Sequence, residues 1–557
     1  MGFLLHFLLL VSVCFASKLP IVDLGYERHQ AFSFNSSLGL YNFSNIRYAA
    51  PPLGDLRFRA PALPTTNRSQ VQNGSVGIVC PSAAPLWEQD IEEPFLLSIL
   101  YNTTFNQSTN ISSYPYTPAK LDPRTTEDCL FLDVVVPKKI FDRAQNKSYI
   151  PNDKLAPVLV WIYGGGYTMG DKSSSDASGL VHRSTVSGDG IVFVAMNYRL
   201  GAFGWLSGKS LKANGTANAA LHDQRFALDW VYKNIHLFGG DSRRVTIMGE
   251  SAGGGSVMHQ ITAYGGNAGP SPFQQAIVQS PGWVPMPAEK QQEQTLQQFL
   301  TILNVTSVEE ARRLPSKKLI AANAYQVGTK SSYGAFTYGP VVDGTFVPAL
   351  PGQLLLEGNF DHNLNVMVGH NADEGLLFTS PASRNSSYLA SQLKQEFEYV
   401  RPNVTKYVTQ VLYPPIYDGT YGYTNSIQRD AFLVSELIFI CNTDYINRAF
   451  HNQTFAYEFS IPPALHGQDV AYTFYSDGAG ASDSTVANVT VAMVMQDWFT
   501  SFVQSGVPVS CLAPTFPRHG HRGQLMNIAS QSISPMRDPT NNPRCRFWQT
   551  APYYEPS

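Results

Sequence analysis

The stretch Arg244–Gly255 (RVTIMGESAGGG) decides the fold that this sequence is expected to adopt. It opens with a β-branched, apolar run typical of a buried strand, and it closes with small residues that suit the start of a helix. Between the two lies Gly249-Glu250-Ser251-Ala252-Gly253, which matches the pattern G-x-S-x-G. Small residues beside the serine allow a sharp, strained turn that exposes its hydroxyl group. The stretch therefore predicts Ser251 as a nucleophile.

Apolar runs on either side of this stretch indicate the rest of a sheet. Strands are expected at Ala156–Ile162, Gly190–Met196, Gln275–Gln279, Leu364–Val368 and Thr454–Ile461, and a helix at Asp223–Ile235. Buried strands that alternate with helices imply a mostly parallel sheet covered by helices on both faces. The pattern predicts the α/β class and, with G-x-S-x-G between a strand and a helix, the α/β-hydrolase fold. In such sheets ligands bind at the carboxyl ends of the strands.

Three glycines, Gly164-Gly165-Gly166, follow the first of these strands, directly after Tyr163. A glycine-rich loop at this place lets backbone N–H groups approach the substrate and stabilise the charge that develops on its carbonyl oxygen. We predict that the N–H groups of Gly165, Gly166 and Ala252 form this oxyanion hole.

A nucleophilic serine also needs a histidine base, and the base needs an acid that orients it. In this fold the order along the chain is serine, acid, histidine. Two acids, Asp373 and Glu374, follow the strand Leu364–Val368. Their spacing from the strand does not choose between them.

Four histidines follow these acids. His451 precedes a glycosylation sequon, and His519 and His521 belong to a polar loop remote from any expected strand. His466 comes directly after the strand Thr454–Ile461. Because the last member of such a triad belongs at a strand end, we predict His466 as the base.

Composition excludes several classes of function. The chain has 557 residues, of which 43% are hydrophobic and 15% charged, so it can bury a large core. Its net charge of −3 and the lack of a basic stripe argue against a nucleic-acid partner. No stretch after the N-terminus is long and apolar enough to predict a transmembrane helix. No clustered His/Cys pattern indicates a metal, and no cofactor is expected.

Three features predict export. Residues 1–16 resemble a signal peptide, with an apolar run and cleavage before Ser17. Five of the six cysteines lie after it, which in an oxidising compartment predicts two disulfides and one odd thiol. Asn-x-Ser/Thr sequons are dense, as on secreted surfaces; they occur at Asn35, Asn42, Asn67, Asn73, Asn102, Asn106, Asn110, Asn146, Asn214, Asn304, Asn385, Asn403, Asn452 and Asn488.

These motifs resemble the type-B carboxylesterase/lipase family, which includes cholinesterases and secreted fungal esterases and lipases. The resemblance covers nearly the whole chain after the signal peptide. It rests on Ile46–Phe58 (IRYAAPPLGDLRF), Glu127–Asp133 (EDCLFLD), Asn197–Gly201 (NYRLG) and Phe238–Asp241 (FGGD), besides the serine motif. It implies a single catalytic domain over residues 17–557.

The resemblance also implies roles for particular residues. It favours Glu374 over Asp373 as the acid and agrees with His466 as the base. Tyr163 stands where the family usually has His or Gln before the glycines, and it is expected to reshape the rim of the oxyanion hole. The resemblance implies an ion pair between Arg57 and Glu127. By the same resemblance disulfides join Cys80 to Cys129 and Cys441 to Cys545, which leaves Cys511 as the odd thiol. The loop 80–129 corresponds to a lid in related lipases, and its apolar segment Pro94–Tyr101 would either meet a lipid surface or pack over the active site.

The expected activity is carboxylic ester hydrolysis through an acyl-enzyme on Ser251. A small-molecule or lipid ester is the expected substrate, and its acyl chain, like the oligomeric state, stays open. Two alternatives keep the fold: an enzyme that processes a biosynthetic ester or lactone, and an adhesion module without catalysis. The adhesion alternative requires a missing triad member, whereas the serine, acid and histidine are all present here.

Overall fold

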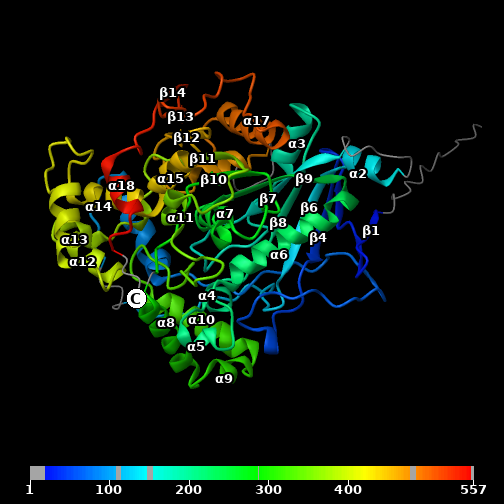
Figure 1. Ribbon diagram of the computed structural model, residues 1–557, viewed down its shortest axis with the longest axis horizontal. Helices are drawn as coiled ribbons and strands as arrows, with labels where there is room; N and C mark the ends of the chain where they lie inside the picture. Colours follow the sequence, from blue (N-terminus) through cyan, green and yellow to red (C-terminus); the bar gives the residue numbers. More distant parts are fainter. Residues whose placement is uncertain (1–18, 108–113, 147–154, 287, 477–484, 554–557) are drawn as a thin grey trace, which may run out of the picture.

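A mixed sheet runs through the centre of the computed structural model (Figure 1). The structure describes residues 19–107, 114–146, 155–286, 288–476 and 485–553. The predicted signal peptide and Asn110 lie outside these residues. Strands of the main sheet follow the order β14-β13-β12-β11-β10-β9-β7-β8-β6-β4-β3, and a small second sheet has the order β1-β2-β5.

The strands of the main sheet are β3 (Ser33–Asn35), β4 (Leu40–Arg47), β6 (Phe131–Pro137), β7 (Ala156–Ile162), β8 (Val192–Met196), β9 (Gly240–Glu250), β10 (Gln275–Gln279), β11 (Asn365–Asn371), β12 (Phe455–Phe459), β13 (Gln524–Ile528) and β14 (Ile533–Arg537). The small sheet contains β1 (Ile21–Asp23), β2 (Arg28–Gln30) and β5 (Val71–Gln72). From β8 to β13 along the sheet, each neighbouring pair is parallel. The strands beyond them pair antiparallel.

The α-helices are α1 (Glu93–Leu100), α2 (Lys138–Gln145), α3 (Ser178–Val186), α4 (Gly201–Trp205), α5 (Lys209–Lys212), α6 (Ala219–Asn234), α7 (Ala252–Ile261), α8 (Glu289–Leu303), α9 (Val308–Arg312), α10 (Ser316–Lys330), α11 (Pro351–Glu357), α12 (Tyr388–Glu396), α13 (Pro402–Tyr407), α14 (Ser426–Val434), α15 (Cys441–Ala449), α16 (Gln468–Thr473), α17 (Val489–Ser505) and α18 (Pro543–Gln549). Helices α6 and α7 pack together against β9, while α3 and α17 pack together elsewhere on the sheet (Figure 1). The predicted α/β class, with helices covering both faces, is confirmed.

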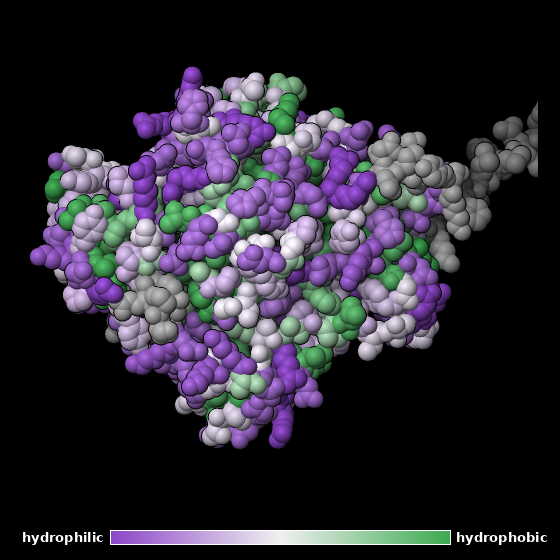
Figure 2. Space-filling view, in the orientation of Figure 1, coloured by the Kyte–Doolittle hydropathy of each residue, from purple (hydrophilic) through white to green (hydrophobic). Residues whose placement is uncertain are grey.

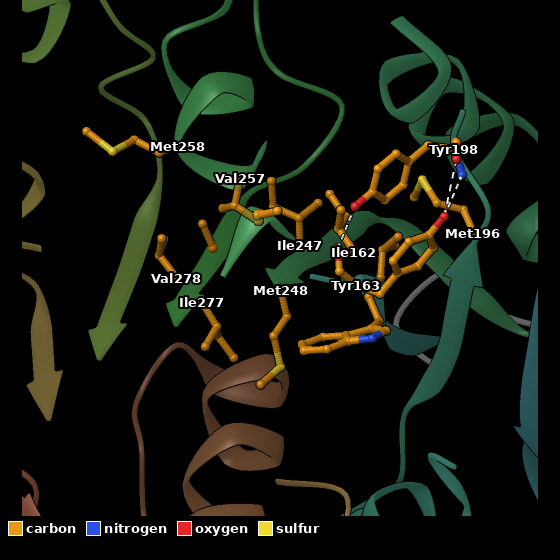
Figure 3. Packing of buried hydrophobic residues seen from close by; sticks show 14 of the residues in the cluster. Ile162, Tyr163, Met196, Tyr198, Ile247, Met248, Val257, Met258, Ile277 and Val278 are labelled. Carbon is orange, nitrogen blue, oxygen red and sulfur yellow. Dashed lines mark hydrogen bonds between the residues drawn. The ribbon is translucent and has the colours of Figure 1, made fainter. Parts of the chain in front are cut away.

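Alternation along the central strands explains why they are buried on both sides. Figure 3 shows Ile247 of β9 on the same side as Val257 of α7, whereas Met248 points the opposite way. All three side chains are fully buried. A strand whose successive side chains enter two different hydrophobic layers must be apolar throughout, as the sequence of β7 also is.

The chain changes direction at β7, and this change places the site. From β7 it passes to β8 on one side and then to β9 on the other. The connection after β7 and the connection after β9 therefore leave the sheet in opposite directions. They open a crevice at the carboxyl ends of these two strands. The predicted oxyanion loop follows β7 and the predicted nucleophile follows β9, so both lie at this crevice.

The surface is largely polar. Hydrophilic residues cover most of the face in Figure 2, with apolar residues interspersed among them. Among the described residues, no helix combines the length and the apolarity that crossing a membrane requires.

Candidate active site

Ser251 occupies the strained turn that its sequence motif predicts. It lies between β9 and α7 with φ 57° and ψ −124°, a conformation that costs a non-glycine residue energy. Close packing explains the small residues around it. A Cβ atom on Gly253 would lie 2.0 Å from the carbonyl oxygen of Ile162, and one on Gly249 would lie 2.5 Å from the backbone of Gly253. The turn thus depends on these glycines to press the nucleophile helix against β7.

His466 bridges Ser251 and Glu374. Its Nε2 lies 2.8 Å from Ser251 Oγ, and its Nδ1 lies 2.5 Å from Glu374 Oε2. Glu374 is fully buried, and its other carboxyl oxygen accepts a hydrogen bond of 2.6 Å from the backbone N–H of Asn371. These contacts fix the carboxylate on two sides and present it to the imidazole.

The second candidate acid, Asp373, faces elsewhere. Its backbone N–H donates to the carbonyl oxygen of Ala464 at 2.9 Å, which sets the register between the strand-end loops. That register turns Glu374, not Asp373, toward His466. The two acids follow the same strand, so only the tertiary pairing of the loops distinguishes them.

The other histidines take different places. His451 and His521 are exposed. The expectation that His519 lies in a loop remote from strands is wrong, because residue 518 bridges to β12 and His519 is buried. Its Nε2 lies 2.9 Å from a carboxyl oxygen of Asp538, which satisfies the imidazole in the protein interior.

Glu250 is a third carboxyl group near the imidazole. Its Oε1 lies 3.4 Å from His466 Nε2. Burial raises the pKa of Glu250 to about 8 against the opposing effect of His466. For Glu374, burial acts in the same direction, but the charge and hydrogen bond of His466 outweigh it and hold the pKa below its usual value. Glu374 is therefore the acid that ionises more readily, and its charge can stabilise a positive imidazole.

The carboxyl groups also act on the histidine. Burial by itself lowers the pKa of His466, but the charges of Glu250 and Glu374 outweigh burial and raise it to about 9. Protonated His466 is thus stabilised between the two acids. Such stabilisation is what a base requires at the moment when it has taken a proton from a nucleophile.

The glycine loop lies directly beside Ser251. A Cβ atom on Gly164 would lie 2.9 Å from Ser251 Cβ, so the loop and Ser251 are in contact. Gly165 and Gly166 adopt positive φ values of 103° and 58°. Within the described part of the chain, the N–H groups of Gly165, Gly166 and Ala252 make no hydrogen bond to a protein group. They are available to an incoming oxygen atom.

Tyr163 and Tyr198 hold the start of this loop (Figure 3). Their rings stack with centroids 4.4 Å apart, and Tyr198 Oη donates to the carbonyl oxygen of Tyr163 at 2.7 Å. Tyr163 Oη donates in return to the carbonyl oxygen of Tyr198 at 3.2 Å. Sequence reasoning expected Tyr163 at the rim of the hole, but it is buried beneath the loop, and the role of Tyr198 was missed. The signal for Tyr198 was its place in the motif Asn197–Gly201.

Asp469 is another group that sequence reasoning missed. It is fully buried, three residues beyond His466, and accepts hydrogen bonds from Tyr457 Oη at 2.7 Å and Gln279 Nε2 at 3.0 Å. Asn371 Nδ2 lies 3.3 Å from its other oxygen. Asp469 thus ties the loop of His466 to the ends of β10, β11 and β12.

The cysteines that the resemblance paired are joined in the structure. Disulfides link Cys80 to Cys129 and Cys441 to Cys545, and Cys511 is free and exposed. The lid-like segment between the first two carries helix α1. Phe95 of this helix is buried, whereas Leu97 and Leu100 are each 41% exposed. The helix therefore packs by one face and offers the other to solvent.

Arg57 and Glu127 form the ion pair that the resemblance implied. Arg57 Nη2 lies 2.6 Å from Glu127 Oε2, and both residues are buried. The described sequons are exposed at Asn35, Asn67, Asn73, Asn102, Asn106, Asn146, Asn304, Asn385 and Asn403, and partly buried at Asn42, Asn214, Asn452 and Asn488. No cluster of three or more His, Cys, Asp or Glu side chains suited to a metal ion occurs within the described ranges.

Comparison with known proteins agrees with this geometry. Residues 29–548 match the Carboxylesterase family. The chain is 39% identical over 548 residues to Carboxylesterase patB of Penicillium expansum, with 96% of each chain covered. It is 32% identical over 394 residues to a secreted lipase of Arthroderma benhamiae, covering 69% of this chain and 72% of that one.

A solved structure shows the same fold. The crystal structure of Aspergillus niger EstA matches with a TM-score of 0.79 and 26% identity, covering 97% of this chain and 99% of the other. The predicted α/β-hydrolase fold is confirmed by this likeness together with the sheet order. The chain therefore belongs to the carboxylesterase family and is a carboxylic ester hydrolase.

Proposed function

We propose that the chain is a secreted serine esterase that transfers an acyl group to water through Ser251, with Glu374 and His466 as the other members of its triad. The observation that carries this proposal is the continuous hydrogen-bonded relay from Ser251 Oγ through His466 to Glu374. Each contact is within hydrogen-bond distance, and the serine sits at a strained turn with free N–H groups beside it.

The first half of the reaction forms the acyl-enzyme. His466 Nε2 accepts the proton of Ser251 as its Oγ attacks the ester carbonyl carbon. The N–H groups of Gly165, Gly166 and Ala252 donate to the oxygen that becomes negative. Glu374 keeps the Nδ1 proton in place and stabilises the positive imidazole. The bond to the alcohol oxygen then breaks, and that oxygen leaves with the proton from His466.

The second half returns the enzyme to its starting state. A water molecule gives a proton to His466 as its oxygen attacks the acyl carbon, with the same N–H groups in place. The acyl–Ser251 bond breaks, and Ser251 recovers its proton from His466. The products are a carboxylic acid and an alcohol, so the steps together consume one water molecule.

Ester hydrolysis by wild type, Ser251→Ala and Ser256→Ala tests the mechanism. Ser256 is a matched control, because it is a buried serine of α7 whose hydroxyl accepts a hydrogen bond from Gln224. We expect hydrolysis of p-nitrophenyl acetate by wild type and by Ser256→Ala, and loss of about 10⁶-fold in Ser251→Ala. Reaction with diethyl p-nitrophenyl phosphate should release one p-nitrophenolate per chain from wild type and from Ser256→Ala, and none from Ser251→Ala.

Other outcomes would decide against the proposal. Equal hydrolysis by Ser251→Ala and wild type would place the chemistry on another group. A wild type that hydrolyses no ester and does not react with the phosphate ester would favour the adhesion alternative.

Three observations support export. Disulfides close the loops 80–129 and 441–545, sequon asparagines lie at the surface, and a relative is named a secreted lipase. We expect fungal expression of the full chain to release a glycoprotein that begins at Ser17. N-terminal sequencing and digestion with an N-glycosidase measure both properties. Retention of residues 1–16 in the released protein would contradict the predicted cleavage.

A further inference from the structure

A polar cavity lies at the β4 end of the main sheet (Figure 1). Its volume is about 460 Å³, and its walls come from β4 and β6 of the main sheet and from β5 of the small sheet. A cavity of this size can hold a ligand of about two sugar rings. Of the described residues, those that line it include no member of the catalytic triad, so it is a separate site.

Asn45 of β4 brings an unsatisfied acceptor to the wall of this cavity. The residue is 8% exposed, and its Nδ2 donates to the carbonyl oxygens of Gly74 at 3.2 Å and Val76 at 2.7 Å. Its Oδ1 is buried and, among the described residues, accepts no hydrogen bond. A buried acceptor without a donor costs free energy, so a ligand that donates to it from the cavity would stabilise the fold.

The charges around the cavity favour a neutral ligand. Arg47 lies over the ring of Phe131, with its Cζ 4.3 Å from the ring centroid, and donates to both carboxyl oxygens of Asp128, at 2.6 and 2.8 Å. Its charge is therefore already compensated, and Glu27 adds a carboxylate to the wall. A phosphate or sulfate ion would gain little here, whereas a sugar offers neutral hydroxyl and amide groups that donate to an acceptor.

Two sequon asparagines, Asn67 and Asn73, lie on the wall of the same cavity. Oδ1 of each accepts a hydrogen bond from the backbone N–H of the serine two residues later, Ser69 at 3.3 Å and Ser75 at 3.1 Å. These bonds fix the direction of both side chains. Within the described ranges, Nδ2 of either residue donates to no protein group, so a sugar can be attached to it without breaking a bond of the fold.

The sequon at Asn214 shows the contrary arrangement. Its Nδ2 donates to Glu309 Oε1 at 2.8 Å, and the residue is partly buried. A sugar on this nitrogen would have to displace Glu309. The free amides at the cavity are thus a property of that place and not of every sequon.

Asn73 is better placed than Asn67 to bring a sugar to Asn45. The backbone that follows Asn73 is held by Asn45 Nδ2 through the carbonyl oxygen of Gly74. A Cβ atom on Gly74 would lie 1.9 Å from the carbonyl oxygen of Ser44, so this segment rests directly on β4. Asn67 is tied instead to the segment before β2, through its backbone N–H. A sugar on Asn73 therefore starts next to the side chain that carries the unsatisfied oxygen.

We propose that this cavity is an internal saccharide-binding site, filled by the first sugars of an N-glycan on Asn73. Glycosylation replaces one hydrogen of Asn73 Nδ2 by C1 of the first sugar. The donor is a lipid-linked oligosaccharyl diphosphate, whose diphosphate leaves as the nitrogen loses its proton. Sugar hydroxyl or amide groups then donate to Asn45 Oδ1, and the glycan bridges β4 of the main sheet and β5 of the small sheet. The inference rests on the proposed export, because a chain meets such a donor in the secretory pathway.

Protection from endoglycosidase H, which cleaves between the first two sugars, tests the inference on the full chain secreted from a fungal host. The Asn385 sequon is the matched control: it is exposed, its Oδ1 accepts the same hydrogen bond, from Ser387 at 3.1 Å, and it is not among the described residues that line the cavity. Mass spectrometry of peptides measures the glycan that remains at each site. Three variants each remove one sequon and keep its asparagine: Ser75→Ala for Asn73, Ser69→Ala for Asn67 and Ser387→Ala for Asn385.

We expect native wild type to lose the Asn385 glycan at least about 10-fold faster than the Asn73 glycan, because cleavage at Asn73 requires local opening of the cavity. After denaturation both glycans should be cleaved at the same rate. Ser75→Ala should lower Tm by about 2 °C or more. Ser69→Ala and Ser387→Ala should stay within about 1 °C of wild type. Wild type and Ser75→Ala produced without glycans in a bacterial periplasm should melt together, which assigns the loss to the sugar and not to the serine hydroxyl.

Three results would overturn the internal site alone: an Asn73 glycan released as fast as the Asn385 glycan, an unmodified Asn73 in a chain that is glycosylated elsewhere, or protection of the Asn67 glycan in its place. A chain that is not released, or that carries no glycan at any sequon, would overturn the proposed export and the inference together. Hydrolysis of p-nitrophenyl acetate by the same samples reports separately on the proposed Ser251 mechanism.

Discussion

Tyr198 Oη donates a hydrogen bond of 2.7 Å to the carbonyl oxygen of Tyr163, the last residue before the oxyanion glycines. This carbonyl belongs to the peptide that leads into Gly164. Tyr198 is itself held on both sides, because Asn197 Nδ2 donates to the carbonyl oxygen of Cys129 and Arg199 forms a buried ion pair with Asp223. A rigid anchor thus fixes the direction in which the oxyanion loop leaves β7.

Tyr198→Phe should lower kcat by about 10-fold and leave KM nearly unchanged. Loss of an oxyanion donor costs about 100- to 1,000-fold, and a displaced donor should cost less than an absent one. Steady-state kinetics and the inhibition constant of a trifluoromethyl ketone, which mimics the tetrahedral intermediate, measure the effect. Tyr423→Phe is a matched control, since Tyr423 is buried and donates to the carbonyl oxygen of Pro414 at 2.6 Å. Equal kcat in both variants would show that the loop does not need this anchor.

Glu374→Gln tests which of the two neighbouring acids orients His466. An amide in place of the carboxylate favours the wrong imidazole tautomer and cannot stabilise its positive form, which costs about 10⁴-fold in kcat in a comparable triad. Asp373→Asn is the matched control and should change kcat by less than about 10-fold, because the hydrogen bond of His466 Nδ1 goes to Glu374. Single-turnover acylation rates measure the effects of both substitutions. If Asp373→Asn were the inactive variant, the assignment of the acid would be wrong.

Glu250 should control the pH dependence through His466. Its carboxylate lies 3.4 Å from His466 Nε2 and stabilises the protonated imidazole. Only neutral His466 can accept a proton, so kcat/KM rises with pH as His466 loses its proton. Glu250→Gln removes a group that raises the pKa of His466, and the acid limb of the profile should therefore move to lower pH by about one unit.

The control for this profile is Glu458→Gln. Glu458 is a half-buried carboxylate of β12 that accepts a hydrogen bond from Ser460. Its removal should leave the acid limb in place. An acid limb that stays fixed or moves to higher pH in Glu250→Gln would show that Glu250 does not stabilise protonated His466.

Burial explains which parts of the fold the sequence could predict. Strands β7 and β10 were predicted with the bounds that the structure has, because β7 is apolar throughout and β10 has an apolar centre, Ala276–Val278, as buried strands do. Strand β4 (LYNFSNIR) was missed, since its buried and partly exposed positions alternate irregularly and its pairing shifts at a bulge. Polar residues within such an edge region remove the signal on which the prediction depends.

The residues of the site likewise differ in how far local sequence patterns could indicate them. Ser251 follows β9 directly and His466 lies in the loop after β12, so positions relative to the strands indicated both residues as candidates. Phe336, whose ring packs on the oxyanion glycine Gly166, lies in a turn without periodicity, and this contact arises only when the lid and the oxyanion loop are packed together. The two residues lie far apart in the sequence, so no local pattern indicates their contact. Neither the three-glycine motif nor the serine motif includes Phe336.

The ion pair of Arg57 and Glu127 provides a prediction about stability. Two hydrogen bonds, of 3.0 Å and 2.6 Å, join the guanidinium to the carboxylate. Arg57 Nη1 also donates to the carbonyl oxygens of Arg312 and Leu314, each at 2.6 Å, so the pair links the N-terminal region to the loop before α10. With both charges buried, removal of one leaves the other uncompensated.

Glu127→Gln should therefore lower the free energy of unfolding by about 3 to 5 kcal/mol. The amide keeps the shape of the side chain, so the loss reports the buried, unpaired guanidinium and not a cavity. Urea unfolding followed by tryptophan fluorescence measures it. Glu289→Gln is the control, because Glu289 pairs with Lys212 where both side chains are more than 40% exposed, and water stabilises the separated charges there. If both variants unfold at the same urea concentration as the wild type, Arg57 must reach solvent or another acceptor once Glu127 is neutral.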